Sequence, residues 1–277
     1  MNRLASALLM LVLAAGALLG ARDAHAQFLF STPSAQAGML NQPVPAVLLA
    51  QLEQASQRGL GFAHAPQPPS LQSISGPLRG RPPVLLYVGA DYCPYCAAQR
   101  WGLVLTLARF GTLSGLRYML SSAHDVFPNT ATFSLAQARL SSRVLHLAAY
   151  ETADREEKPL MKLPPQAQAV FQQFDVPPHV QYAYGIPFVY LDGRFLMTQL
   201  MISPASLAGL NWQQIAAQLD DPHSALFAAI MPRVNLLTAA ICSLNGGVPA
   251  HVCNAPGVRA AAPLLAHLPD AATPQGG

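Results

Sequence analysis

The sequence predicts an α/β fold, and three stretches of the chain carry that prediction. Residues 84–89, Val-Leu-Leu-Tyr-Val-Gly, have the composition of a buried strand and lead into a helical pattern. Two further apolar runs flank Asp192-Gly193, a dipeptide typical of a tight β-hairpin turn. Farther downstream, a long helix is predicted over residues 222–242. Strands and helices therefore alternate along the chain, as in α/β proteins.

The first 26 residues have the pattern of a secretory signal peptide. Arg3 supplies a positive start, residues 4–19 are almost wholly apolar, and Ala24-His25-Ala26 is a small-residue cleavage site. Cleavage there would leave a mature chain that starts at Gln27. The alternative is an uncleaved membrane anchor, because the apolar stretch is near the lower length limit for a membrane span. In both cases the protein is expected to be exported, that is, periplasmic or otherwise extracytoplasmic.

The composition narrows the function classes. The 277 residues are 52% hydrophobic and only 10% charged, with a formal net charge of +3. No basic run indicates nucleic-acid binding, and no acidic block indicates a solvated tail. After the signal pattern, no apolar run is both long enough and free enough of charge to span a bilayer. Export would place the four cysteines in an oxidising compartment, where they form disulfides or act as redox groups.

The chain divides into four parts. Residues 1–26 are the signal peptide, and residues 27–81 are predicted to be a Pro-rich leader with one helix over 45–58, where leucines recur at helical spacing. A folded domain with a C-terminal helical extension is predicted over residues 82–254. The tail, residues 255–277, is rich in Ala, Pro and Gly and is predicted to be flexible.

Two cysteines separated by two residues follow the strand at 84–89. Cys93 falls where a helix would begin, and Pro94 takes the first helical position, where its missing N–H costs nothing. Free backbone N–H groups and the helix dipole stabilise an anion at that point. Cys93 is therefore predicted to be the more acidic and more nucleophilic thiol. Cys96, one turn farther on, is predicted to be shielded and to act as the resolving thiol.

Local patterns predict the remaining elements. They are a helix over 97–110, strands over 116–121 and 144–150, a solvated charged loop over 151–158, a helix over 164–174 and a helix over 211–219 that opens with a capping box.

The order of these elements resembles the thioredoxin superfamily. The resemblance is carried by a strand, the run Cys93-Pro94-Tyr95-Cys96, a helix, and later Gly185-Ile186-Pro187 followed by an Asp-Gly hairpin. Pro187 matches the family's cis-proline, which lies opposite the dithiol and helps to present substrate backbone. The resemblance therefore implies a thioredoxin-like fold with a central mixed sheet flanked by helices, and a substrate contact at Ile186 and Pro187. Tyr92 and Tyr95, on either side of Cys93, are predicted to shape the mouth of the site and to contact substrate there. Because ninety residues separate Cys96 from Pro187, the resemblance also implies a helical or mixed insertion.

A narrower resemblance covers more of the chain. Residues 92–110 and 121–133, together with the C-terminal cysteine pair, look like an exported thioredoxin-like family that is described as a domain of unknown function. The superfamily resemblance extends over about residues 82–200, whereas the narrower one reaches Cys253. The narrower family has no established substrate, so it bears on the fold and not on the function.

Two positions depart from the superfamily pattern. Tyr87 stands where the related enzymes have a buried acid, and Ala97 stands where thioredoxins have a lysine. The resemblance therefore leaves the proton acceptor of the dithiol unidentified. Of the charged residues nearby, Asp91 is interpreted as a solvated turn residue and Arg100 as a surface residue.

The predicted function is thiol–disulfide exchange with exported proteins, without a cofactor or a bound metal. Cys93 would form a mixed disulfide with the substrate and Cys96 would resolve it. Exported proteins with thiols or disulfides are the predicted partners, a membrane redox protein is a further candidate, and nucleic acid is not expected. The alternatives are a static disulfide on a non-catalytic scaffold, a copper chaperone or assembly factor with soft thiolate ligands, and a zinc site.

Cys242 and Cys253 are predicted to form a structural disulfide. Asn245-Gly246-Gly247 between them has the composition of a turn, and no helix begins at either cysteine in the predicted pattern. The alternative is a second redox centre that relays electrons to the first pair.

Overall fold

A computed structural model of the chain describes residues 33–270. Its contacts divide the chain into one unit over residues 1–40 and a second over residues 41–277. In the first unit the structure describes helix α2 (Pro33–Met39). The second unit contains the sheet and the other described elements. The predicted signal peptide lies outside the described residues.

The centre of the second unit is a mixed sheet of five strands. In spatial order these are β1 (Leu71–Ser73), β9 (Phe195–Met197), β8 (Phe188–Leu191), β2 (Val84–Gly89) and β7 (His146–Glu151). β2 and β7 pair in parallel, so that Gly89 lies beside Glu151 at the end of both strands. The other pairs are antiparallel. The strands predicted over 84–89 and 144–150 are therefore confirmed as β2 and β7.

The predicted hairpin joins β8 to β9. Asp192 and Gly193 both have positive φ, at 49° and 70°, which is the backbone conformation that a type I′ hairpin turn requires. Glycine adopts this conformation without steric cost, and aspartate tolerates it better than most residues. The dipeptide thus fixes the register in which β9 returns along β8.

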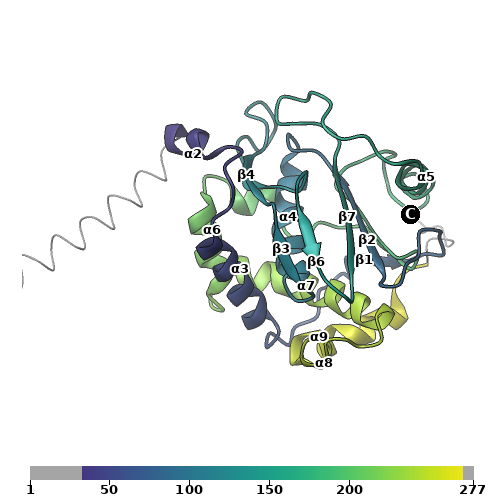
Figure 1. Ribbon diagram of the computed structural model, residues 1–277. Helices are drawn as coiled ribbons and strands as arrows, with labels where there is room; N and C mark the ends of the chain where they lie inside the picture. Colours follow the sequence, from purple (N-terminus) through teal and green to yellow (C-terminus); the bar gives the residue numbers. More distant parts are fainter. Residues whose placement is uncertain (1–32, 271–277) are drawn as a thin grey trace, which may run out of the picture. The chain divides into compact units, whose positions relative to one another are not determined.

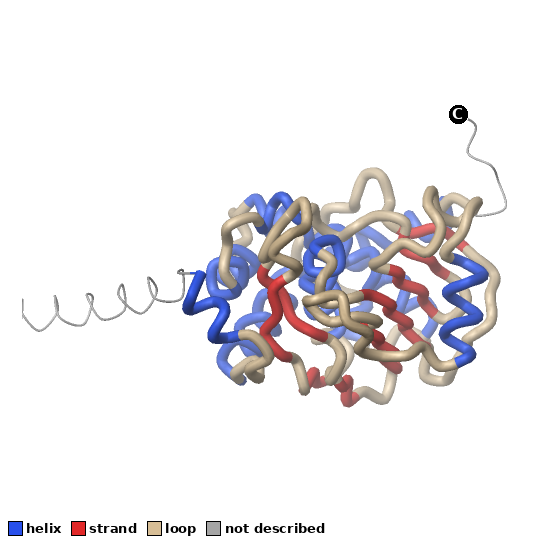
Figure 2. The backbone as a smooth tube through the Cα atoms, turned by 90° about the horizontal axis from the view of Figure 1, so that it is seen from above, coloured by secondary structure: helices blue, strands red, loops and turns tan. Residues whose placement is uncertain are grey.

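Helices cover both faces of the sheet, as Figures 1 and 2 show. α5 (Pro165–Phe174) lies on one face and packs against Leu86, Val88, Phe188 and Tyr190 of β2 and β8. α4 (Pro94–Leu107) and α7 (Ala225–Leu244) lie on the other face. Because side chains alternate along a strand, Tyr87 points to the α4 side. The helices predicted over 97–110, 164–174 and 222–242 are confirmed.

Part of the ninety residues between Cys96 and Pro187 forms a mixed insertion, since the same stretch also contains most of α4 and the sheet strand β7. It contains two antiparallel ribbons and α5; the ribbons are β3 (Thr112–Ser114) with β6 (Arg139–Ser141), and β4 (Arg117–Leu120) with β5 (Ala131–Ser134). β4 is the strand predicted over 116–121. With the five-stranded mixed sheet, this insertion and the C-terminal helices, the chain has the predicted α/β, thioredoxin-like fold.

The segment predicted as a leader contributes to this fold. The predicted helix is confirmed as α3 (Ala46–Gly59), which buries Leu48 and Leu52 and packs against α4, α7 and α6 (Trp212–Asp220). Farther along, β1 forms one edge of the sheet. The second unit therefore begins well before residue 82, where the domain was predicted to start.

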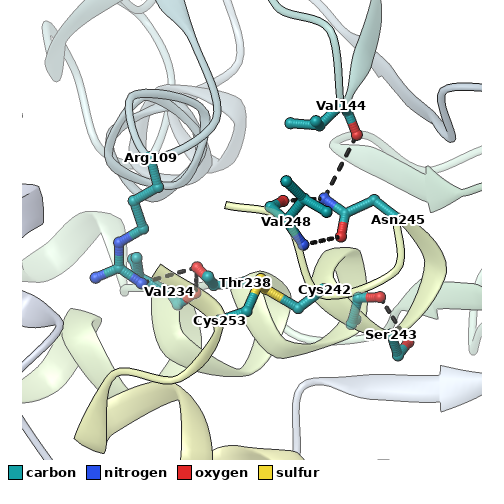
Figure 3. Close-up of a disulfide and its surroundings, with 10 residues drawn as sticks. Arg109, Val144, Val234, Thr238, Cys242, Ser243, Asn245, Val248 and Cys253 are labelled. Atoms are coloured by element: carbon teal, nitrogen blue, oxygen red, sulfur yellow. Dashed lines mark hydrogen bonds between the residues drawn. A yellow bond between two sulfur atoms is a disulfide. The ribbon is translucent and has the colours of Figure 1, made fainter. Parts of the chain in front are cut away.

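A buried arginine connects α3, α4 and α7. Arg109, just beyond the end of α4, donates from Nη1 to Asn235 Oδ1 and to Thr238 Oγ1, both at 2.8 Å, and from Nε to Ser56 Oγ at 3.2 Å. Figure 3 shows its bond to Thr238. All of these acceptors are neutral, so this guanidinium has no carboxylate partner among them.

The C-terminal helices form a compact extension. α6 opens with the predicted capping box between Asn211 and Gln214. Within residues 33–270, α7 is the one helix long and apolar enough to cross a membrane, and most of it is buried against neighbouring helices such as α4, α6 and α9 (Pro256–Ala261), as in the core of a folded domain. The predicted Cys242–Cys253 disulfide is present at the end of α7 (Figure 3).

The prediction of a flexible tail is wrong up to residue 270. α8 (Ala250–Cys253), α9 (Pro256–Ala261) and the 3₁₀ helix η2 (Ala262–His267) follow α7, and α9 packs against it. After η2 the chain returns to the sheet, where the Ser73 N–H donates to the Pro269 carbonyl at 2.9 Å. Packing on α7 therefore orders a segment whose composition alone indicates flexibility.

Candidate functional site

Cys93 and Cys96 lie at the junction of β2 and α4. Cys93 is the N-cap residue of α4, with extended backbone, and Pro94 is in the first turn. The Cys96 backbone N–H donates to Cys93 Sγ at 3.3 Å. Both cysteines are free thiols; Cys96 is wholly buried, whereas Cys93 is 5% exposed. The thiol that reaches solvent is thus the one predicted to be the nucleophile.

The Ile186–Pro187 peptide bond is cis and lies opposite Cys93. The Cys93 thiol sulfur is 3.8 Å from the Ile186 carbonyl oxygen. These two residues are brought to the dithiol because β8, which begins directly after Pro187, pairs with β2. The structure therefore places Ile186 and Pro187 where the resemblance implies a contact with substrate.

A groove of about 380 Å³ borders the cis-proline. Tyr95, Ile186 and Pro187 line it, together with side chains from the segments 175–189 and 197–200. Tyr95 is 41% exposed and also borders a second hollow, of about 630 Å³, which Phe127 and residues 199–206 help to line. Apolar and aromatic surface thus lies on either side of Tyr95, close in sequence to Cys93, the less buried of the two thiols.

Tyr92 occupies a different position from the other three predicted contact residues. It is not among the residues that line either of these hollows. Its side chain is half-buried, and its carbonyl accepts a hydrogen bond from the Ser122 N–H at 2.8 Å. Tyr92 therefore helps to hold the insertion against the dithiol loop.

Three charged side chains form a buried cluster beside the dithiol. Arg100 makes a two-pronged ion pair with Glu151, from Nε to Oε1 at 2.9 Å and from Nη2 to Oε2 at 2.6 Å. The same Nη2 is 3.6 Å from Asp91 Oδ1. Glu151 also accepts from the Leu135 N–H at 3.2 Å, and Asp91 accepts from the Ser134 hydroxyl at 3.0 Å. Arg100, Glu151 and Asp91 are all nearly inaccessible to solvent.

This cluster corrects three interpretations of the sequence. Asp91 is not a solvated turn residue, Arg100 is not on the surface, and Glu151 does not belong to a solvated loop. Parallel pairing with β2 carries Glu151 to the start of α4, and Ser134 at the end of β5 covers Asp91. Glu151 lies 51 positions after Arg100 and Ser134 lies 43 positions after Asp91, so no local pattern indicates that these charges are buried together.

The two thiols differ in acidity. The pKa of Cys93 lies below the ordinary thiol value, first because of a hydrogen bond with the Cys96 side chain and then because of the Cys96 backbone N–H and the charge of Arg100. Burial of Cys93 opposes this shift. Burial raises the pKa of Cys96 well above its ordinary value. At neutral pH the thiolate is therefore favoured on Cys93, and Cys96 keeps its proton.

The acidic groups around the site are perturbed as well. Burial raises the pKa of Asp91 to about 7, although the charge of Arg100 opposes the shift. Burial also raises the pKa of Asp175, a residue of the groove that the sequence did not single out, to about 7. Tyr87, in the position of the missing acid, has a buried hydroxyl without a hydrogen-bond partner and a pKa raised well above 10 by burial. Tyr87 therefore stays neutral and does not replace that acid.

The site offers little for a metal ion. Within residues 33–270, no group of three or more His, Cys, Asp and Glu side chains is arranged to hold one. Structural zinc needs four such ligands. The two thiols of Cys93 and Cys96 remain as a pair of soft donors.

The comparisons with known proteins identify a family. No curated protein matches the chain, and no solved structure does. A family model described as Domain of unknown function (DUF929) matches residues 78–243, a segment that contains the dithiol, the cis-proline and the Arg100 cluster. Because this match covers more than half of the 277 residues, the chain belongs to the DUF929 family.

Proposed function

We propose that this chain is an exported member of the thioredoxin superfamily and that it exchanges disulfides with exported proteins. The observation that carries the proposal is the position of Cys93. It caps the N-terminus of α4, has Cys96 buried one turn behind it, and faces the cis Ile186–Pro187 bond. Export is proposed from the signal pattern of residues 1–26.

The proposed reaction proceeds through a mixed disulfide. The Cys93 thiolate attacks a substrate disulfide, so that a bond forms between Cys93 and one substrate sulfur while the substrate S–S bond breaks. The released substrate sulfur takes a proton. Cys96 then loses its proton and attacks Cys93 Sγ, which frees the second substrate thiol and leaves a Cys93–Cys96 disulfide. Two electrons pass to the substrate, and the reverse sequence oxidises a substrate dithiol.

The buried charges set the energetics of these steps. Arg100 stabilises the Cys93 thiolate, and this favours the reduced form of the couple. Glu151 contributes to the high pKa of Cys96, so the second attack needs a proton acceptor. Asp91 lies 3.6 Å from Arg100, and its pKa is raised to about 7. Its ionisation near neutral pH is proposed to regulate how much positive charge of Arg100 acts on the Cys93 thiolate.

The surface around the thiol fits a polypeptide substrate. Tyr95 is an exposed aromatic side chain beside Cys93, and Tyr182 and Tyr184 are exposed near the groove of the cis-proline. Exposed apolar surface of this kind is typical of sites at which another polypeptide binds. The proposed substrate therefore places an extended segment across Ile186 and Pro187, with its own cysteine next to Cys93.

The decisive experiment measures the reactivity and the reduction potential of the dithiol together. We expect the rate of alkylation by iodoacetamide to titrate below the ordinary thiol pKa of about 8.5, and Cys93→Ser to abolish both rapid alkylation and disulfide exchange with reduced or oxidised substrate proteins. The Cys96→Ser variant should accumulate a mixed disulfide between Cys93 and the substrate, because the resolving thiol is missing. Equilibration with glutathione then gives the potential, which decides whether the protein donates or accepts electrons.

Two outcomes would overturn the proposal. One is a Cys93 that titrates near 8.5 and exchanges no faster than a free cysteine. The other is a Cys93→Ser protein that still exchanges disulfides at the original rate.

A further inference from the structure

Four arginines border one cavity at the far end of the sheet from the dithiol. The cavity has a volume of about 810 Å³ and is lined by Arg79, Arg81, Arg143 and Arg194, with Pro82, Pro83, Val144, Leu244 and Asn245 among the other lining residues. These arginines are exposed and come from the approach to β2, the approach to β7 and the β8–β9 turn. They are spread over 116 positions of the sequence, so no basic run reveals them.

Most of the positive charge of the cavity lining is uncompensated. Asp192 is the one acid in its lining, and its Oδ1 already accepts the backbone N–H groups of Gly80 at 2.8 Å and Val84 at 3.1 Å. Four guanidinium groups and one carboxylate leave a formal charge of +3 on the lining. In the part of the chain that the structure describes, the side chains of Arg81, Arg143 and Arg194 have no hydrogen bond or ion pair.

One wall of the cavity is held in place by the C-terminal extension. Asn245, at the end of α7, donates from Nδ2 to the carbonyls of Val144 at 3.5 Å and Val248 at 2.6 Å, and its Oδ1 accepts the Val248 N–H at 3.1 Å. Figure 3 shows these bonds beside the Cys242–Cys253 disulfide, which closes the same loop. The wall is thus fixed by contacts that do not depend on a ligand.

We propose that this cavity binds a ligand that carries several phosphate groups. Guanidinium groups match phosphate oxygens with two parallel hydrogen bonds, and arginine is the preferred residue for such contacts. One phosphate ion would fill only a small part of 810 Å³ and would leave arginines unpaired. The volume is within the range of about 300–1,000 Å³ found for small-molecule sites.

The cavity is separate from the proposed redox site. Its lining includes Pro83, directly before β2, whereas Cys93 follows the other end of that strand. Six strand residues span roughly 20 Å. The ligand would therefore bind without covering Cys93, and this proposal stands or falls independently of disulfide exchange.

Two sources share this chemistry, namely a soluble polyphosphate compound and the headgroups of anionic phospholipids. The first arm of the test titrates inorganic tripolyphosphate into the full chain by calorimetry at low salt. The double variant Arg81→Gln and Arg143→Gln should bind at least about tenfold more weakly, because two charge-assisted hydrogen-bond donors to phosphate are lost. A matched control, Arg139→Gln and Arg259→Gln, removes two exposed arginines outside the cavity and should change affinity by less than about twofold.

The second arm measures sedimentation of the same proteins with vesicles of phosphatidylglycerol and phosphatidylcholine. Binding to tripolyphosphate alone assigns a soluble ligand, and binding to vesicles alone assigns a headgroup, provided that each requires Arg81 and Arg143. Arg194→Gln should weaken the same binding in an independent variant. The proposal is overturned if neither probe binds, or if the control pair loses as much affinity as the cavity pair. Unchanged melting temperatures verify that the variants fold.

Discussion

Two buried arginines of this protein, Arg100 within α4 and Arg109 just after it, are held in opposite ways. Arg100 is paired with Glu151 through two short hydrogen bonds and lies near Asp91. Arg109 is bound by Asn235, Thr238 and Ser56, all through neutral oxygens. Both guanidinium groups are nearly inaccessible to solvent, so the two sites differ in charge compensation and not in burial.

The difference separates a charge beside the proposed redox site from a charge that joins helices. Arg100, beside the dithiol, lowers the pKa of Cys93, and the two carboxylates around it control how much positive charge that thiol experiences. Arg109 lies at the C-terminal end of α4, where free carbonyls and the helix dipole favour a cation. It joins three helices, and burial lowers its own pKa because no carboxylate compensates it.

Breaking the Arg100 pair should have the largest effect. Arg100→Met would leave Glu151 buried without a cation, and we expect a loss of about 3–5 kcal/mol in the free energy of unfolding. The pKa of Cys93 should rise at the same time, because a neighbouring positive charge is lost. Urea unfolding and pH-dependent alkylation measure the two effects. In the double variant Arg100→Met and Glu151→Leu most of the stability should return, and a double variant as unstable as the single one would contradict this account.

Asp91→Asn sharpens the comparison by removing the second carboxylate near Arg100. Burial raises the pKa of Asp91 from 3.8 to about 7, so the folded state binds this proton more tightly than the unfolded state. The resulting stabilisation is complete below about pH 4 and is lost as the pH rises through 7. Over that interval the unsubstituted protein should lose up to about 4 kcal/mol relative to Asp91→Asn. Urea unfolding at pH 4, 5.5, 7 and 8 tests this, and parallel stability curves would contradict it.

Arg109→Met should act on stability alone. The substitution leaves the oxygens of Asn235, Thr238 and Ser56 without their donor, and we expect a loss of about 1–3 kcal/mol in the free energy of unfolding. The alkylation pKa of Cys93 should stay where it is, since Arg109 is not among the groups that shift it. A change in that pKa comparable to the Arg100→Met effect would show that the two arginines are not separate.

The smallest predicted effect isolates one contact of Arg109. Thr238 accepts from Arg109 and donates to the Val234 carbonyl four residues earlier, whereas Thr106 in α4 only donates to the Gly102 carbonyl. Thr238→Val should therefore destabilise the protein by about 1 kcal/mol more than the matched Thr106→Val. Thermal unfolding of both variants measures the difference, and equal losses would mean that Asn235 alone satisfies that nitrogen.

Local patterns in the sequence predict much of this fold and, within the site, the dithiol and the helix start. The strand, the dithiol and the helix start are contiguous, and Asp192-Gly193 determines its turn without distant contacts, so these features are readable from a few residues. Pro187 could be placed through the resemblance. Tyr95 is exposed at the groove as expected, whereas Tyr92 is held by the insertion.

The buried charges could not be predicted in this way. Glu151 opens a run of charged residues and has the composition of a solvated loop, and only the pairing of β2 with β7 shows that it is covered. Asp91 is buried because Ser134, more than forty residues later, donates to it. The arginine cavity has the same origin, since the topology of the sheet brings its four cations together.

The edge strand β1 has a consequence for the order in which the fold is completed. It pairs with β9, and Ser73 within it also forms a bridge with Asp270. β1 thus precedes its partners on both sides by more than a hundred residues in the sequence. Such long-range pairings slow folding, because the intervening chain must be ordered before they form. The β1 edge of the sheet therefore stays open to other strands until residues 195–197 on one side and residues 269–270 on the other have been ordered beside it.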